Sequence, residues 1–178
     1  MKRYFRRSIL ASLILAVATL VIAYGQQPKD SNKKMSDMAD EQMNKRGDHV
    51  MGFDHTKTTH HFILQESGGS IQVTANSSDD VESSEQIRMH LKHIAKMFAD
   101  GNFNAPMLIH DQTPPGVPVM QELKGEIKYN YKEIDRGAAV RISTKNPTAL
   151  KAIHEFLRFQ IKEHKTGDLP DISKRTDN

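Results

Sequence analysis

Residues 58–75 alternate apolar and polar side chains with period two, which is typical of β-strands that bury one face. The first run covers 58–65 and the second covers 71–75. Gly68 and Gly69 lie between them and favour a tight turn, because glycine accepts positive φ without steric cost. The pattern predicts a β-hairpin.

The next apolar positions follow the 3.6-residue period of a helix. Residues 84–100 are predicted to be helical, with Ser83 and Gln86 resembling a capping box and Gly101 at the C-terminal end. The positions of the apolar stripe are Ile87, Leu91, Ile94 and Phe98. The stripe predicts a helix that packs on the hairpin.

The second half of the chain shows the same order of patterns. Two alternating runs, 127–131 and 140–142, flank the turn residues 135–137. Asn146 as N-cap and Pro147 as first helical residue then predict the start of a second helix. Its apolar stripe is formed by Leu150, Ile153, Leu157 and Ile161, and Gly167 is expected at its end.

A connector, residues 103–120, joins the two halves. The apolar run 107–109 is consistent with a minor strand. Pro114, Pro115 and Pro118 predict a rigid extended turn, because proline lacks an N–H donor and restricts its preceding neighbour.

Together these patterns predict an α+β fold of two hairpin–helix (ββα) repeats. One hairpin with one helix cannot bury its apolar face alone, so we expect a four-stranded antiparallel sheet with two helices on one face. The expected single domain covers residues 51–168, and residues 169–178 are expected to form a loose tail.

The N-terminal segment 1–25 has the pattern of a signal peptide. Four basic residues precede an uncharged apolar run, and Ala23 to Gly25 offers small residues for cleavage before Gln26. The alternative is an uncleaved membrane anchor. Residues 26–50 are polar and predicted to be a flexible leader or a short frayed helix, so we expect a periplasmic or secreted protein, off the membrane after cleavage.

The charge balance and the lack of cysteine limit which classes of function are possible. The chain has 25 Lys and Arg and 22 Asp and Glu. Four of the basic residues lie in 1–25, which leaves 21 basic against 22 acidic residues and no basic footprint for nucleic acid. Without cysteine, a metal site must use His, Met, Asp, Glu or backbone oxygen. No nucleotide-binding, hydrolase or metalloprotease motif is present, so the sequence favours a protein that is not an enzyme.

Histidine and methionine are the remaining candidates for chemistry. On the first predicted helix His90, His93 and Met97 form a stripe beside the apolar face, and His60 or His61 on the first strand is expected to face it. Adjacent strand residues point to opposite faces, so His60 and His61 do not serve the same face. His55 lies just before the strand. Met35, Met38, Met43 and Met51 add thioethers near the leader.

These donors predict a binding protein for a transition metal, with copper favoured because imidazole and thioether suit it. Haem with axial histidine or methionine is the alternative cofactor. Two other functions stay open. One is a structural module that binds another envelope protein, and the less favoured one is a small hydrolase or transferase. Half-buried histidines that serve packing alone are the simplest alternative to a site.

Several stretches of residues 46–168 resemble a family of small exported bacterial proteins of unknown function. The stretches are 51–54, 57–62, the Gly68-Gly69 hairpin, 86–91, 114–118 and 153–161. Some members of that family carry the label aspartate carbamoyltransferase. The chain is too short for a two-domain carbamoyltransferase and has no Ser-Thr-Arg-Thr phosphate loop. The resemblance therefore implies one folded unit and no activity.

Overall fold

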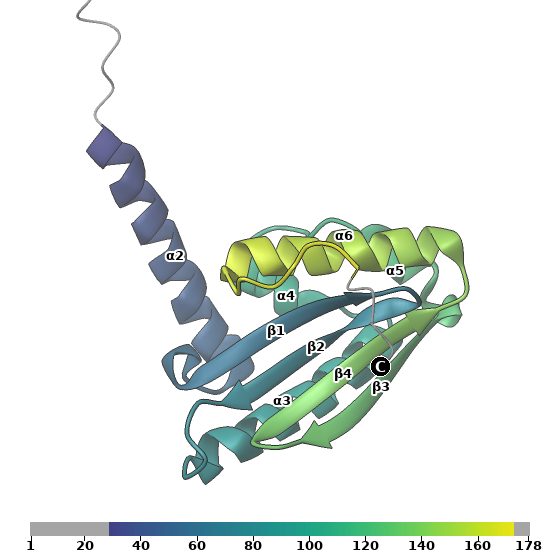
Figure 1. Cartoon of the computed structure of the whole chain (residues 1–178). Helices are drawn as coiled ribbons and strands as arrows, with labels where there is room; N and C mark the ends of the chain where they lie inside the picture. The colour runs from purple at the N-terminus through teal and green to yellow at the C-terminus, as the bar shows by residue number, and fades with distance from the viewer. Residues whose placement is uncertain (1–28, 173–178) are drawn as a thin grey trace, which may run out of the picture. The chain divides into compact units, whose positions relative to one another are not determined.

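The computed structural model describes residues 29–172 as five α-helices, a four-stranded sheet and two short 3-10 turns (Figure 1). The chain divides into two compact units, 1–41 and 42–178. The described part of the first unit belongs to helix α2 (Lys29–Met51), which ends in the second unit. The predicted signal peptide, 1–25, lies outside the described residues, and the expected leader, 26–50, is helical from Lys29 onwards.

The sheet is antiparallel, with the strand order β1-β2-β4-β3. The first hairpin joins β1 (Thr58–Gln65) to β2 (Gly68–Ala75), and the second joins β3 (Ile127–Ile134) to β4 (Gly137–Thr144). β2 and β4 pair at the centre, with Ile71 opposite Val140. The structure thus confirms an α+β fold with a four-stranded antiparallel sheet.

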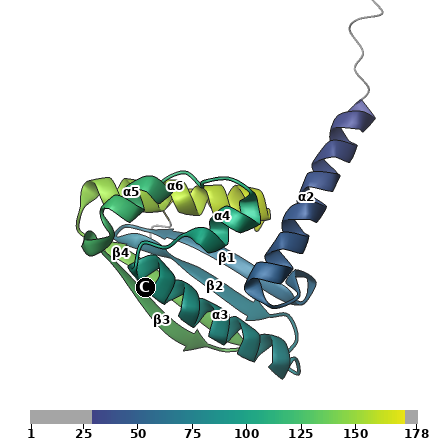
Figure 2. The same ribbon diagram turned by 180° about the vertical axis from the view of Figure 1, so that it is seen from behind.

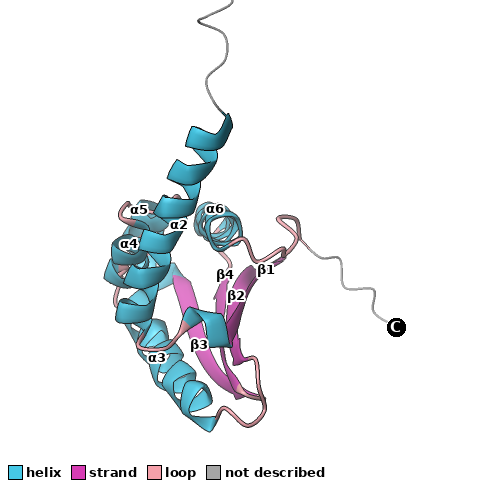
Figure 3. Cartoon of the chain, turned by 90° about the vertical axis from the view of Figure 1, so that its left-hand side faces the viewer, coloured by secondary structure: helices cyan, strands magenta, loops and turns pink. Residues whose placement is uncertain are grey.

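The long helices α3 (Val81–Ala99) and α6 (Pro147–His164) cover the sheet. α3 packs on β4 and β3, and α6 packs mainly on β1 and β2 (Figure 2). The end view shows both helices on the same side of the curved sheet (Figure 3), and most of the strand residues on that side are buried. The two helices meet where Phe98 of α3 contacts Phe156 of α6, with ring centroids 6.0 Å apart. One hydrophobic core therefore joins sheet and helices.

The connector is helical, so the strand expected at 107–109 was wrong. Helix α4 (Asn104–His110) contains that run. Helix α5 (Val117–Glu122) follows Pro114 and Pro115 and contains Pro118 in its first turn, so the predicted extended turn does not reach Pro118. A short amphipathic run cannot be assigned to helix or strand by periodicity alone. Ala105 and Ile109 are buried on one side of α4 while Leu108 is 61% exposed, which is helical spacing.

The turns and caps differ in detail from the prediction. The first hairpin turns at Glu66 and Ser67, and Gly68 and Gly69 open β2 instead. A Cβ on Gly68 would lie 2.1 Å from the carbonyl oxygen of Ile142, so glycine is required there by close strand approach. Asp80, not Ser83, caps α3 by accepting a hydrogen bond from the Ser83 N–H. Asn146 caps α6 as predicted.

Candidate functional site

Four histidines gather at one end of the core, each from a different element. His60 lies on the inner face of β1, between buried Thr58 and Phe62. His164 is the last residue of α6, which packs against β1. Their rings stack with centroids 5.7 Å apart and planes within 10°. Two residues from distant parts of the sequence thus form one imidazole pair.

The other two histidines extend this pair on both sides. His110, at the end of α4, contacts the His164 ring edge to face at 5.0 Å. His110 Nε2 lies 3.1 Å from Gln160 Oε1 and donates to it in the tautomer that satisfies the amide oxygen. On the other side, Phe53 lies between His60 and His90, at centroid distances of 6.0 and 5.6 Å. An imidazole cluster therefore links β1, α3, α4 and α6.

Burial keeps these imidazoles neutral. Loss of hydration lowers the pKa of His60 and of His90 to about 4, and that of His164 to about 3, with smaller contributions from neighbouring imidazoles. Burial lowers the pKa of His110 too, against an opposing hydrogen bond to Gln160. At neutral pH each ring therefore has one nitrogen lone pair, the form that ligates metals.

The cluster separates two cavities. The outer pocket, about 230 Å³, lies between β1, the end of α6 and the C-terminal turns of α2. The inner cavity, about 60 Å³, is lined mainly by buried core residues. Both are lined by Met51, His60, Ile109 and His164. Within the described chain, no protein group hydrogen-bonds a ring nitrogen of His60, His90 or His164. Their donors and acceptors are thus free for a ligand.

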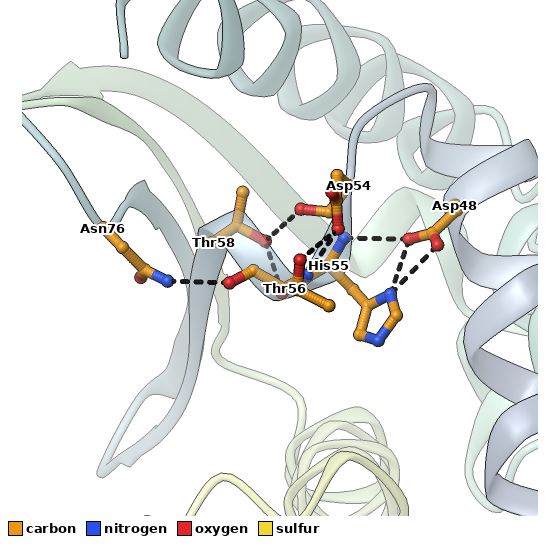
Figure 4. A network of polar contacts seen from close by, with 6 residues as sticks. All are labelled: Asp48, Asp54, His55, Thr56, Thr58 and Asn76. Atoms are coloured by element: carbon orange, nitrogen blue, oxygen red, sulfur yellow. Dashed lines mark hydrogen bonds and ion pairs between the residues drawn. The ribbon is translucent and has the colours of Figure 1, made fainter. Parts of the chain in front are cut away.

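A second polar group lies at the rim, where α2 turns into β1 (Figure 4). Asp48, Asp54 and His55 bring one ligand atom each within 4.8 Å of the others, the spacing of a metal site. Asp48 accepts from His55 Nδ1 at 2.8 Å and from the His55 backbone N–H at 2.8 Å. Asp54 accepts from the Thr56 N–H and hydroxyl, which lowers the Asp54 pKa. These hydrogen bonds show that the three side chains stabilise the turn that leads from α2 into β1.

The residues that the sequence predicted for the site do not all lie together in the structure. His60 and His90 both line the inner cavity. His61 points to the opposite side of β1, where its Nδ1 lies 2.8 Å from Asp168 Oδ1. His93 is exposed, and Met97 packs against the core. His55 lines the outer pocket.

His164 and His110 were not among the predicted site residues. His164 ends α6 and His110 ends α4. Tertiary packing brings both helices close to β1, so no local sequence pattern could predict that these histidines lie near His60. The available signal was the position of His164 beside the apolar stripe of α6. Met51, noted only as a soft donor, proves to line both cavities.

Comparison of the chain with protein-family models, with curated protein sequences and with solved structures finds no match. The resemblance to small exported bacterial proteins therefore stays a prediction. Among residues 29–172, no helix combines the length and the apolar character needed to cross a bilayer.

Proposed function

We propose that this protein binds one soft transition metal ion, Cu(I) first, in the outer pocket. The observation that carries the proposal is the set of donors around that single pocket. Two thioethers, of Met43 and Met51, and three imidazoles, of His55, His60 and His164, line it. Thioether and imidazole together favour copper over the harder cations that prefer carboxylate oxygen.

His60, His164 and Met51 are the proposed ligands, with His55 and Met43 at the rim. The His60 and His164 rings are half-buried and neutral at neutral pH, so binding displaces no proton from them. Because these two rings lie parallel, a shared ion requires one ring to rotate about its χ angles. His164 is the last residue of α6, so its ring is the one that we expect to rotate.

His55 is held as ligating histidines commonly are. Metal-bound imidazoles usually donate their second nitrogen to a carboxylate, which fixes the tautomer and raises the basicity of the ligating nitrogen. Asp48 makes that contact with His55 Nδ1 at 2.8 Å, so Nε2 carries the lone pair (Figure 4). This arrangement supports a role for His55 as a ligand that binds the ion when it enters the outer pocket.

The cavity volumes favour an ion over haem. Pockets for cofactors of drug size or larger enclose about 300 to 1,000 Å³. The outer pocket has about 230 Å³ and the inner cavity about 60 Å³. A porphyrin is larger than either, so we favour copper, and we expect purified protein to show no Soret absorption.

The test is anaerobic Cu(I) titration of protein purified without a histidine tag, against a colorimetric chelator such as bathocuproine disulfonate. We expect about one ion per chain, a loss of affinity of about tenfold or more in His60→Phe, and a smaller loss in Met51→Leu. His93→Gln is the control, because His93 is exposed and lines neither cavity. Uptake of less than about a tenth of an ion per chain would refute the proposal.

That negative result would favour the alternative function, an interaction module of the cell envelope. One observation supports it: Leu108 is 61% exposed on α4, beside a surface pocket that it lines with Met107. Export remains part of both proposals and rests on the 1–25 pattern. N-terminal sequencing of protein from the periplasm tests it, with cleavage before Gln26 expected.

We further infer that the two hairpin–helix units are internal repeats. The outer strands β1 and β3 each precede an inner strand, β2 or β4, and the inner strands pair with each other. A long helix follows each hairpin in the chain. This order supports a common origin of the halves, 58–99 and 127–164.

A further inference from the structure

The inner cavity lies directly behind the proposed copper ligands. His60, His164 and Met51 line it on one side and line the outer pocket on the other. An ion held by these three side chains therefore borders both the outer pocket and the inner cavity. Metal sites that act on a ligand keep such an open coordination position, whereas structural sites close it.

The size of the inner cavity limits what it can hold. Its volume is about 60 Å³. A water molecule occupies about 30 Å³ in the liquid, and a cavity that binds benzene measures about 150 Å³. The inner cavity thus matches a molecule of about two non-hydrogen atoms, and larger organic ligands are excluded without rearrangement of the core.

The walls favour an uncharged occupant. All but four of the lining residues carry apolar side chains, and the deep walls include Ile71, Val73 and Phe98. Apolar cavities of this kind stay dry and bind apolar gases. The four polar residues are His60, His90, Gln160 and His164.

A buried amide in the cavity wall also lacks a partner. Gln160 is 3% exposed, and its Nε2 makes no hydrogen bond within the described chain, while its Oε1 pairs with His110. An unsatisfied buried donor costs about 1 to 3 kcal/mol unless a ligand or water accepts from it. An amide N–H beside an apolar cavity can stabilise the partial negative charge of a metal-bound diatomic molecule.

We propose that the inner cavity admits an uncharged diatomic molecule, of the class of dioxygen, nitric oxide and carbon monoxide, to the copper ion of the outer pocket. This inference rests on the proposed copper function and names the ligand class of the same site. The diatomic molecule binds the ion from the core side, with the Gln160 amide as a buried hydrogen-bond donor in the cavity wall.

Two probes test the cavity and the ion separately. Crystals pressurised with xenon show the cavity by itself, since xenon needs no metal. Carbon monoxide added to the Cu(I)-loaded protein shows the ion with its open position, through an infrared C–O stretching band. We expect one xenon atom in the inner cavity and one carbonyl band.

A matched pair of variants ties the signals to this cavity. Val73→Ile adds a methyl group to the cavity wall, and Val140→Ile adds the same group to a buried position that does not line the cavity. We expect Val73→Ile to abolish xenon binding and to weaken carbon monoxide binding about tenfold, with copper affinity within about twofold of wild type. Val140→Ile should keep both signals. Ala105→Val, also in the wall, repeats the test if the added methyl group of Val73→Ile turns away from the cavity.

The outcomes separate this inference from the proposed function. Absence of copper uptake in the chelator titration would refute the copper site, and this inference with it. Normal copper affinity without a carbonyl band, or with two ordered waters in place of xenon, would overturn the inference alone. A carbonyl band unchanged in Val73→Ile and Ala105→Val would also overturn it, because the molecule would then bind from the outer pocket.

Discussion

Acid should destabilise this fold through its buried imidazoles, and His90 allows the effect to be measured at one position. The pKa of His90 is about 4 in the folded chain, below the ordinary 6.5, because burial removes hydration from the charged form. Between these two pH values the unfolded chain binds more protons than the folded one. The free energy of unfolding therefore falls as pH falls from about 6.5 and levels off below about 4.

The size of the effect follows from the two pKa values. Proton linkage for one such group between pH 7 and pH 5 amounts to a loss of about 2 kcal/mol. His60 and His164 are shifted in the same direction, to about 4 and about 3. The groups are coupled, so their effects do not simply add, and we expect a total loss between about 2 and 6 kcal/mol. That is a large part of the stability of an ordinary domain.

The measurement is urea unfolding followed by circular dichroism at pH 7, 6 and 5, with a chelator present to remove metal. His90→Gln deletes the titrating group, so this variant should lose about 2 kcal/mol less than wild type between pH 7 and pH 5. His93→Gln, at an exposed position of the same helix, is the control and should follow wild type. Equal pH dependence in His90→Gln and wild type would refute the assignment of the shift to His90.

Two further predictions concern the first hairpin. Gly68→Ala should lower the free energy of unfolding by more than about 2 kcal/mol in the same urea assay, because its Cβ would lie 2.1 Å from the Ile142 carbonyl oxygen at a φ of +145°. Gly125→Ala is the control. Its Cβ would lie in open space, so stability should change by less than about 0.5 kcal/mol. His154→Leu should cost about 1 to 3 kcal/mol, because His154 Nε2 lies 3.0 Å from both the Gln65 and the Gly68 carbonyl oxygens and no other side chain hydrogen-bonds them in the described chain. A His154→Leu variant as stable as wild type would show that the turn carbonyls are solvated instead.

The elements that the sequence predicted well are those whose signal is local. Alternation over 58–65 and 127–131 predicted strands, and Asn146 with Pro147 predicted the start of α6, because caps and periodicity act within one or two turns. Helix α4 was missed because its apolar run is short. Asp80 was missed as a cap because Ser83, with Gln86 three residues later, also matches a capping pattern in the sequence.

The sequence predicted only the part of the site that has a local signal. His60 stands out because it occupies a core-facing position of an alternating strand, where an apolar residue is expected. Its partner His164 is set by how α6 packs on β1, and the sequence contains no local mark of that packing. The place of Met51 in the walls of both cavities depends on the turn at Asp48–His55, which is a tertiary detail as well.

Packing alone does not account for imidazoles at these positions. Phe62 and Phe53 already stack against His60, so a third aromatic or aliphatic ring in its place would fill the same space without losing hydration. The chain instead places three neutral imidazoles there, without protein hydrogen bonds at their ring nitrogens in the described part, at a cost in stability that grows in acid. Local departures from what stability favours concentrate at functional sites. The imidazoles that depart from this rule surround one pocket of soft donors. Replacing His60 by Phe should therefore raise the free energy of unfolding at pH 5 while it lowers the affinity for copper. A variant that lost both would show that His60 serves the fold, and the metal proposal would lose its main support.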